Sequence, residues 1–276
     1  MPRRSHPIDP LLQIDTLEYL FNQPRPKGFY FPGESHDFWE MVYVHQGQVT
    51  ATADERVYQL GSGKLLLHKP MEFHRIWSSP DCSPWIVNIS FQAHGDLIPK
   101  LENSCFDLHP DQQQQFWEIV KHFDQVMAFS NSDNTHQYRL AINLTATLLE
   151  AFLIGLTENK KYSLLSQTPN DERYSKIVQV MKENCQEDLS LDQLAKHCQM
   201  SVSNMKRIFR MYSDVGVAKY FMTLKIRYAM ELLDKGYSAV QVAEALHFPD
   251  ATYFYTVFKR ETHMTPMQYR NRKSQP

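Results

Sequence analysis

Three side chains in the first third of the chain have types and a spacing that suit metal-dependent chemistry. His36 is followed after three intervening residues by Glu40, and His74 comes later. Two imidazoles and one carboxylate form a triad that suits iron or manganese. The same residues could also be ordinary polar side chains of strands, and the residue types alone leave both interpretations open.

Aromatic residues alternate with polar ones around this triad; they are Trp39, Tyr43, Phe73, Trp77 and Trp85. Aromatic side chains on strands can line a cavity and stack on a sugar ring, or they can belong to the core. The pattern predicts a binding cavity for a small molecule, and we expect its side chains to be His36, Trp39, Glu40, His74 and Trp77.

The segments that carry these residues have the composition and the residue pattern of β-strands. WEMVYVHQGQVTATAD, RVYQLGSGKLLLHKP and SPWIVNISFQ are short, rich in β-branched and aromatic residues, and interrupted by Gly, Pro or Ser. This pattern predicts an antiparallel barrel or sandwich.

Two helical segments follow the predicted strands. QQQQFWEIVKHFDQVMAF has apolar residues at helical spacing, namely Phe116, Ile119, Val120, Phe123, Val126 and Met127. HQYRLAINLTATLLEAFLIGLTE is apolar on nearly two faces, which predicts one face against the barrel and one against a partner chain. Residues 159–171, NKKYSLLSQTPND, show no period and are expected to be a linker.

The last hundred residues contain one helical unit twice. The first copy spans residues 191–220 and the second spans residues 240–269, with one extra residue in the turn of the second copy. Each copy reads as two helices joined by a tight turn, with Ser201 and Asp250 as the N-caps of the second helices. A repeat of this kind predicts two equivalent surfaces.

Each second helix is expected to present polar and basic side chains to solvent. Short polar groups, amides and Arg near a helix N-terminus suit the major groove of DNA, where base edges carry distinct donors and acceptors. The predicted DNA-binding residues are Ser201, Ser203, Asn204, Lys206, Arg207 and Arg210 in the first copy, and Ala251, Thr252, Tyr255, Thr256 and Lys259 in the second.

Residues 189–270 resemble the AraC/XylS family of transcription regulators. The resemblance rests on MSVSNMKRIFR, VAKYFMTLKIRYAMELLDKG and YFYTVFKRETHMTPMQYR, and the last segment is close to the family signature. His263 and His247 stand where the family usually has Gly, and Asp214 takes the place equivalent to His263. We expect Asp214 and His263 to be left-handed helix C-caps. Thr256 stands where the family often has Arg, so the second helix is expected to read fewer bases or to contact mostly phosphates.

The N-terminal segment is similar to the cupin pattern, H-x3-E-x6-G followed by G, P and H, which is also typical of the effector barrel in this family. Here His36, Glu40 and Gly47 match the first motif, but Glu34 replaces its first His. No further ligand is visible after His74, and regulators of this family generally bind organic effectors. The resemblance therefore implies no metal and no cofactor.

Length and charge agree with two domains. The chain has 276 residues, of which 42% are hydrophobic, and we expect an effector-binding and dimerisation domain at 1–165 and a DNA-binding domain at 172–276. Residues 171–276 contain 16 Lys and Arg against 12 Asp and Glu, whereas the whole chain has a net charge of −2. A basic half beside an acidic half is expected of a protein that contacts DNA phosphates.

The remaining features indicate a cytoplasmic protein. No apolar segment follows the basic N-terminus, no run of about 18 apolar residues is visible, and the four Cys residues form no CxxC pair. We thus expect an α+β two-domain protein with a cupin-like antiparallel β-barrel, dimerisation helices and an all-α double helix-turn-helix. We expect the protein to be a transcription regulator and not an enzyme. It would act as a homodimer that binds double-stranded DNA and a small-molecule effector such as a sugar. We expect no membrane partner, and contact with RNA polymerase is one expected output.

Two alternatives stay open at this point. One is a metal-dependent cupin enzyme, such as an isomerase or oxygenase, that carries a DNA-binding tail. The other is a DNA-binding protein that has no ligand and is regulated by its abundance.

Overall fold

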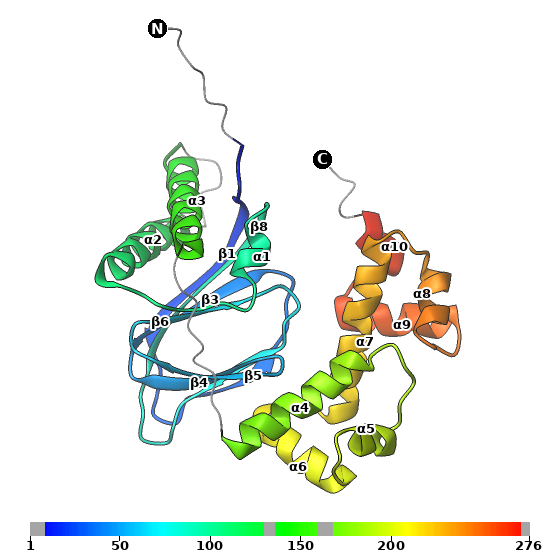
Figure 1. The fold of residues 1–276 in the computed structure, drawn as a ribbon. Helices are drawn as coiled ribbons and strands as arrows, with labels where there is room; N and C mark the ends of the chain where they lie inside the picture. Colours follow the sequence, from blue (N-terminus) through cyan, green and yellow to red (C-terminus); the bar gives the residue numbers. More distant parts are fainter. Residues whose placement is uncertain (1–8, 130–135, 159–167, 272–276) are drawn as a thin grey trace, which may run out of the picture. The chain divides into compact units, whose positions relative to one another are not determined.

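The computed structural model describes residues 9–129, 136–158 and 168–271. Two compact units follow one another along the chain (Figure 1). Within the described residues, the N-terminal unit contains β1–β9 and α1–α3, and the C-terminal unit contains α4–α10. The expected α+β architecture, an antiparallel β-domain followed by an all-helical domain, is confirmed. The N-terminal basic segment and most of the expected linker lie outside the described residues.

The strands of the N-terminal unit form two antiparallel sheets. One has the order β1-β8-β3-β6-β9 and the other has the order β2-β7-β4-β5. The strands are β1 Gln13–Pro24, β2 Tyr30–Glu34, β3 Trp39–Gln46, β4 Gln48–Ala53, β5 Arg56–Gly61, β6 Lys64–His68, β7 His74–Trp77, β8 Trp85–His94 and β9 Cys105–Asp107. The two sheets face each other as layers (Figure 1), and we call them together the barrel.

Both faces of β3 are buried, and they contribute to two different cores. Val42 and Val44 point between the two sheets, where they pack with Leu60 and Ile76. The alternate residues, including Trp39, pack on the outer face of the five-stranded sheet against the helices. Because side chains alternate along a strand, Glu40 shares its face with Val42 and points into the barrel.

Three helices belong to this unit: α1 Ile98–Leu101, α2 Pro110–Ala128 and α3 His136–Thr157. Helix α2 buries Phe116, Ile119, Val120, Phe123 and Val126, as the periodicity predicts. Met127, the last apolar residue of this spacing, has a side chain that is 44% exposed. The apolar face ends at Val126 because Met127 lies one helical step, about 100°, to the side.

Helix α3 is apolar on two sides. Leu149 and Leu153 are fully buried in the core that α2 and α3 form with the sheet, whereas Leu140 and Leu144 are exposed. Among the described residues, α3 is the one helix long and apolar enough to cross a membrane by length and composition, a test that core helices also pass. The predicted absence of a membrane partner stays a prediction.

The C-terminal unit consists of helices, five of which begin at a Ser, Thr or Asp N-cap. The helices are α4 Pro169–Glu183, α5 Leu191–His197, α6 Val202–Tyr212, α7 Val217–Asp234, α8 Ala239–Ala245, α9 Ala251–Thr262 and α10 Pro266–Asn271. The expected linker is wrong at its end, because residues 169–171 form the first turn of α4. Thr168 caps this helix through the Asp171 amide, and Pro169 stands at the position where a helix tolerates proline.

The predicted repeat is confirmed by the helix pairs α5–α6 and α8–α9. Ser201 Oγ accepts a hydrogen bond from the Asn204 amide at 3.2 Å, and Asp250 Oδ1 accepts one from the Tyr253 amide at 2.7 Å. Four residues separate α5 from α6 and five separate α8 from α9, so the extra residue lies in the second turn.

The turns show where left-handed backbone is needed. His247 has a φ of 53° in the second turn, and His263 has a φ of 60° as the C-cap of α9. The expectation for Asp214 is wrong, since it is not among the positive-φ residues described. Helix α6 ends instead at Ser213, whose φ of −151° is extended. An extended C-cap leaves the helix without a left-handed residue, so no glycine is required there.

Candidate nucleic-acid interface and barrel cavity

The outward face of α6 gathers the predicted polar and basic residues of the first unit. Burial of Met205, Ile208 and Phe209 fixes the inward side of this helix. The opposite side exposes Ser203, Lys206, Arg207 and Arg210, with Asn204 half-buried at its edge and Ser201 as the N-cap. The structure therefore brings these six residues to one helix, and their contact with bases or phosphates stays a prediction.

Arg207 is held by its neighbour one turn earlier. Its Nη2 donates a hydrogen bond to Asn204 Oδ1 at 3.0 Å. This contact restricts the orientation of the guanidinium before any partner binds, which lowers the entropy cost of using it. A planar, pre-oriented guanidinium suits bidentate recognition of a guanine edge.

Helix α9 presents a different chemistry from an equivalent face. Thr252, Tyr255, Thr256 and Lys259 are exposed, and Ala251 is half-buried. The hydroxyl of Thr256 donates to the Thr252 carbonyl oxygen at 3.0 Å, so it is engaged by its own helix. Of the five DNA-binding residues predicted on the second copy, Lys259 is the charged one.

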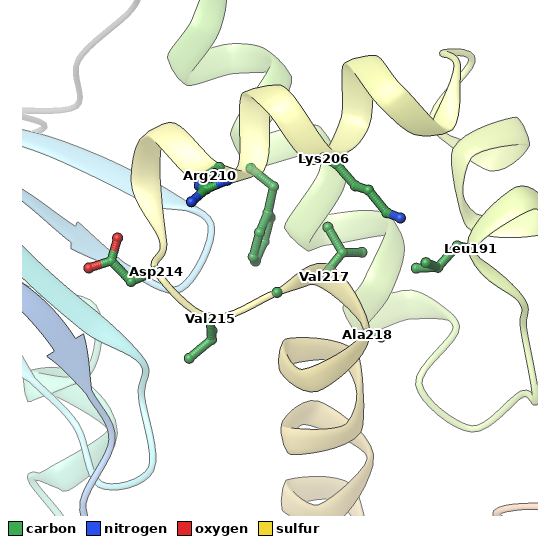
Figure 2. Close-up of a pocket in the computed structure, with 9 residues that line it drawn as sticks. Leu191, Lys206, Arg210, Asp214, Val215, Val217 and Ala218 are labelled. Atoms are coloured by element: carbon green, nitrogen blue, oxygen red, sulfur yellow. The ribbon is translucent and has the colours of Figure 1, made fainter.

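A pocket of about 410 Å³ borders the outward face of α6 (Figure 2). Lys206 and Arg210 line it from α6, and Asp214 lines it from the segment that follows α6. The remaining lining residues come from the start of α5, from α6 and from the turn into α7; they are Leu191, Phe209, Val215, Gly216, Val217 and Ala218. Its two cations lie beside the predicted base-reading face, a placement that suits phosphate contact.

The interior of the barrel contains a smaller polar cavity of about 60 Å³. Its ionisable and amide side chains include Arg25, Glu34, Glu40, His74 and Asn88. The rest of the lining consists of Tyr19, Phe29, Phe31, Val42, His68, Ile76 and Ile86. These residues come from both sheets, so the fold assembles the cavity from distant parts of the sequence.

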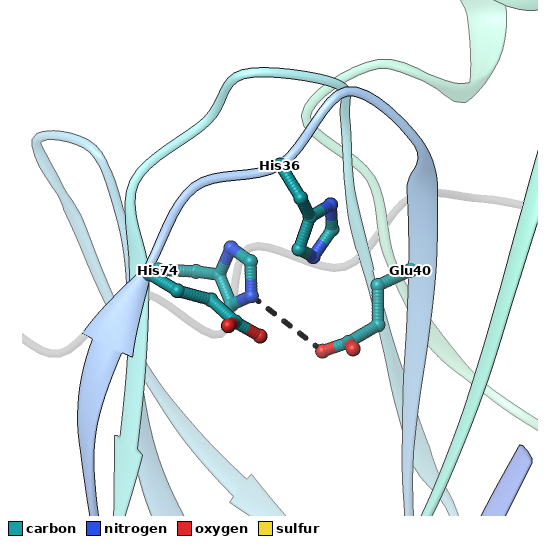
Figure 3. Close-up of side chains that lie close together, drawn as sticks. His36, Glu40 and His74 are labelled. Atoms are coloured by element: carbon teal, nitrogen blue, oxygen red, sulfur yellow. Dashed lines mark ion pairs between the residues drawn. The ribbon is translucent and has the colours of Figure 1, made fainter. Parts of the chain in front are cut away.

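Four residues at this cavity lie close together. One nitrogen or carboxylate oxygen from each of Glu34, His36, Glu40 and His74 lies within 4.8 Å of one from every other. His74 Nε2 is 3.7 Å from Glu40 Oε1, and Figure 3 shows His36 beside that pair. Glu40 also accepts hydrogen bonds from Asn88 Nδ2 at 3.2 Å and from Ser90 Oγ at 3.4 Å.

Burial controls the charge of this cluster. It raises the pKa of Glu40 to about 8, and the nearby negative charge of Glu34 acts in the same direction. Burial lowers the pKa of His36 and raises that of Glu34. In the absence of a ligand, Glu40 is therefore largely protonated at neutral pH and can donate a hydrogen bond as well as accept one.

The structure separates the predicted cavity residues into two groups. Glu40 and His74 line the cavity, and His36 lies next to them in the cluster. Trp39 and Trp77 are not among the lining residues. Trp39 belongs to the core beneath α2 and α3, and the Trp77 ring lies 4.9 Å from the Arg75 guanidinium. Both Trp residues are one position out of phase with the inward-pointing side chains of their strands.

Several cavity residues were not found by sequence reasoning. Tyr19, Arg25, His68 and Asn88 lie on or beside strands far from the His36–Glu40 segment, so only the register brings them there. Glu34, which replaces the first His of the cupin pattern, lies directly across from His74 in the β2–β7 pair.

Comparisons with known proteins agree with this division. A profile described as an AraC-like ligand binding domain matches residues 23–149, and one described as a helix-turn-helix domain matches residues 194–272. The chain is 26% identical to the MmsAB operon regulatory protein of Pseudomonas aeruginosa, over 88% of this chain and 78% of that protein. It is 22% identical to the HTH-type transcriptional activator RhaS of Klebsiella pneumoniae, over 90% of each.

A solved structure, that of ToxT from Vibrio cholerae O395, has a TM-score of 0.38 to this chain at 16% identity, and the match covers 91% of this chain and 96% of ToxT. The curated relatives are transcription regulators and not enzymes, which removes the enzyme alternative. The chain belongs to the AraC family of DNA-binding transcription regulators, with an AraC-like ligand-binding domain and a helix-turn-helix domain.

Proposed function

We propose that this regulator reads one DNA site with α6 and α9 and that a small polar metabolite, such as a sugar, controls its binding from the barrel. The observation that carries the first half is the pair of capped helices with equivalent exposed faces. Helix α7 connects the α5–α6 pair to the α8–α9 pair with 18 residues, roughly 27 Å at about 1.5 Å per residue. That length suits two successive major grooves, which lie roughly 34 Å apart.

The effector would bind in the barrel cavity. Arg25, Glu40 and Asn88 offer donors and acceptors for hydroxyl or carboxylate groups, and Phe29 and Phe31 offer apolar surface. The cavity of about 60 Å³ is smaller than the roughly 300–1,000 Å³ of ordinary ligand pockets. A sugar-sized effector must therefore displace part of the lining, and this displacement would favour one conformation of the regulator over another.

Dimerisation would use the exposed side of α3. Leu140, Leu144, Ala151 and Ile154 form an exposed apolar stripe on that helix, opposite the residues buried in the core. We assign effector binding and dimerisation to residues 1–165 and DNA binding to residues 172–276, extended to the start of α4 at Pro169. The protein would act in the cytoplasm, with contact to RNA polymerase as one output.

Footprinting tests the DNA proposal. The operator is first selected from a random DNA library with the full chain, and the major-groove contacts are then mapped on it. We expect two protected major-groove segments per protomer, one for each recognition helix. A single protected segment would contradict the assignment of both helices to one duplex.

The effector proposal is tested on the same operator with a panel of sugars and related metabolites. We expect at least one compound to change operator affinity and to raise the melting temperature, because ligands that bind the native state stabilise it. If operator affinity responds to none of them, the proposed sugar-type effector is wrong and regulation by abundance is favoured.

A further inference from the structure

Two carboxylates and two imidazoles lie close together beside the barrel cavity. A sugar site needs hydrogen-bonding groups, but it does not need four potential metal ligands in one place. We infer that Glu34, His36, Glu40 and His74 form a binding site for one divalent first-row transition-metal ion. Their ligand atoms lie within 4.8 Å of one another, and Glu40 and His74 are buried. Ligands bound to one ion at about 2.0–2.2 Å lie roughly 3–4 Å apart, so side-chain shifts of about 1 Å would close the site.

The orientation of both imidazoles fits metal binding. His36 Nδ1 lies 3.0 Å from the Phe38 carbonyl oxygen, and His74 Nδ1 lies 3.0 Å from the Glu72 carbonyl oxygen. A carbonyl oxygen can only accept, so each Nδ1 carries the proton and each Nε2 keeps its lone pair. A backbone carbonyl behind the ring is the usual outer support of a metal-ligating histidine.

Each Nε2 is directed into the cluster. His36 Nε2 is buried and has no hydrogen-bond partner among the described residues. His74 Nε2 faces Glu40 Oε1 at 3.7 Å, beyond hydrogen-bond distance (Figure 3). A metal ion between these atoms would supply the partner that the His36 nitrogen lacks and would bridge the His74–Glu40 gap.

Glu34 is placed in the cluster by an irregularity of the backbone. The β2–β7 register shifts between Phe31 and Glu34, and the shift sets Glu34 across from His74. Gly33 makes this possible with a φ of +99°, and a Cβ at Gly33 would lie 2.9 Å from the His74 carbonyl oxygen. Bulges that redirect a side chain are common beside functional sites. Glu34 thereby supplies the fourth ligand atom of the cluster, beside those of His36, Glu40 and His74.

An outer layer supports the ligands. The His68 ring stacks on His74 with centroids 4.3 Å apart, and His68 Nδ1 lies 3.1 Å from Glu72 Oε2. Asn88 and Ser90 hold the Glu40 carboxyl group. Imidazole and carboxylate ligands together suit Zn²⁺, Mn²⁺ or Fe²⁺, and two carboxylates neutralise the charge of a divalent ion. Glu34 is exposed, so the ion has an entry path on that side.

The inference deepens the proposed function, because an ion at this place could hold the oxygen atoms of an effector. Metal binding itself does not depend on that role. It is measured by titration calorimetry on the full chain, after removal of any tag and treatment with a chelator. Zn²⁺ and Mn²⁺ serve as probes, and Co²⁺ reports the ligand set through its visible absorption.

Three variants make the test specific. Glu34→Gln changes an exposed side chain with little change in shape, and His36→Ala removes an imidazole from the cluster. His94→Ala is the control, because its ring is largely exposed and pairs with Asp15 outside the cluster. We expect one ion per wild-type chain, an affinity at least about tenfold lower in the first two variants, and no change in the control.

The outcomes separate the two proposals. Absence of binding by the wild type, or equal binding by all variants, overturns the metal site and leaves DNA recognition untouched. Metal binding by a protein that shows no operator preference would instead contradict the proposed function. If His36→Ala fails to fold, as judged by circular dichroism, Glu34→Gln decides the test alone.

Discussion

Arg207 and Thr256 occupy equivalent places on α6 and α9, and under the proposed function this difference would set the balance between base reading and phosphate contact. Arg207 is exposed and held by Asn204, so its guanidinium is ready for a base edge. Thr256 donates its hydroxyl to its own helix, and Lys259 is a point charge better suited to phosphates. The first unit should therefore carry more of the sequence preference than the second.

Substitution of Arg207 and Lys259 separates these roles. Arg207→Ala should relax the preference for one base and cost roughly 1–3 kcal/mol on the selected operator. Lys259→Ala is the matched comparison and should weaken all sequences about equally, with a salt dependence lower by about one charge. Operator variants titrated at several salt concentrations provide the measurement. A uniform loss of affinity in Arg207→Ala would show that Arg207 contacts only the backbone.

At the scale of elements, the bulge in β2 is the feature that turns an edge strand into part of a site. The strand pairs only with β7 among the described strands, and its irregular end carries Glu34. Gly33 is required there, because a Cβ would lie 2.7 Å from Phe73 Cζ as well as close to the His74 backbone. The backbone must shift to admit any larger residue.

Gly33→Ala tests this requirement. The substitution should lower the free energy of unfolding by about 1–3 kcal/mol, because it adds a strained backbone position and a close contact. It should also weaken metal binding, since Glu34 moves with the strand. Gly61→Ala in β5 is the control, because a Cβ there meets no atom within 4 Å. Thermal unfolding of both variants is the measurement, and equal stability would show that the strand adjusts freely.

The helices of the C-terminal unit could be predicted from the sequence because local signals specify them. Ser201 and Asp250 cap helices whose apolar residues recur at helical spacing, and the repeat confirms each copy through the other. Thr168 and Pro169 are an equally local signal for the start of α4, as N-cap and first-turn proline. The residues just before them lack a regular spacing of apolar side chains, and this lack indicated a linker. The prediction of a left-handed C-cap at Asp214 was wrong because α6 ends at an extended C-cap, and this type of helix end has no characteristic residue in the sequence.

The cavity could be predicted only in part, because both faces of β3 are buried. Alternation shows that Trp39 and Glu40 point to opposite sides, but it does not say which side is the interior when both are covered. The helices α2 and α3 decide this by covering the Trp39 side. Arg25 and Asn88 reach the cavity through strand pairing, which the sequence of either strand does not encode by itself.

At the scale of the whole molecule, the exposed stripe of α3 predicts self-association. Leu144→Glu places a charge on the stripe and should shift the full chain toward monomers, because burying an unpaired carboxylate in an interface is unfavourable. Leu149 is fully buried and Leu148 packs against the core, so neither is suited to this test. Arg139→Glu is the control, because Arg139 is exposed and lies one helical step, about 100°, away from Leu140 and the stripe.

Sedimentation velocity over a range of concentrations provides the measurement. We expect dimers of the wild type and of the control variant, and monomers of Leu144→Glu that keep the circular dichroism spectrum of the wild type. A wild-type monomer at high micromolar concentration would contradict the assignment of this stripe.

Under the proposed function, the unequal chemistry of α6 and α9 would give the DNA site a direction. If one end of each site is read strictly and the other is held through its phosphates, the information content of the operator is concentrated at one end. If such a DNA site were inverted in the genome, the protein would bind in the opposite orientation relative to the start of transcription. Such a regulator distinguishes upstream from downstream within a single protomer, without using the symmetry of a palindrome.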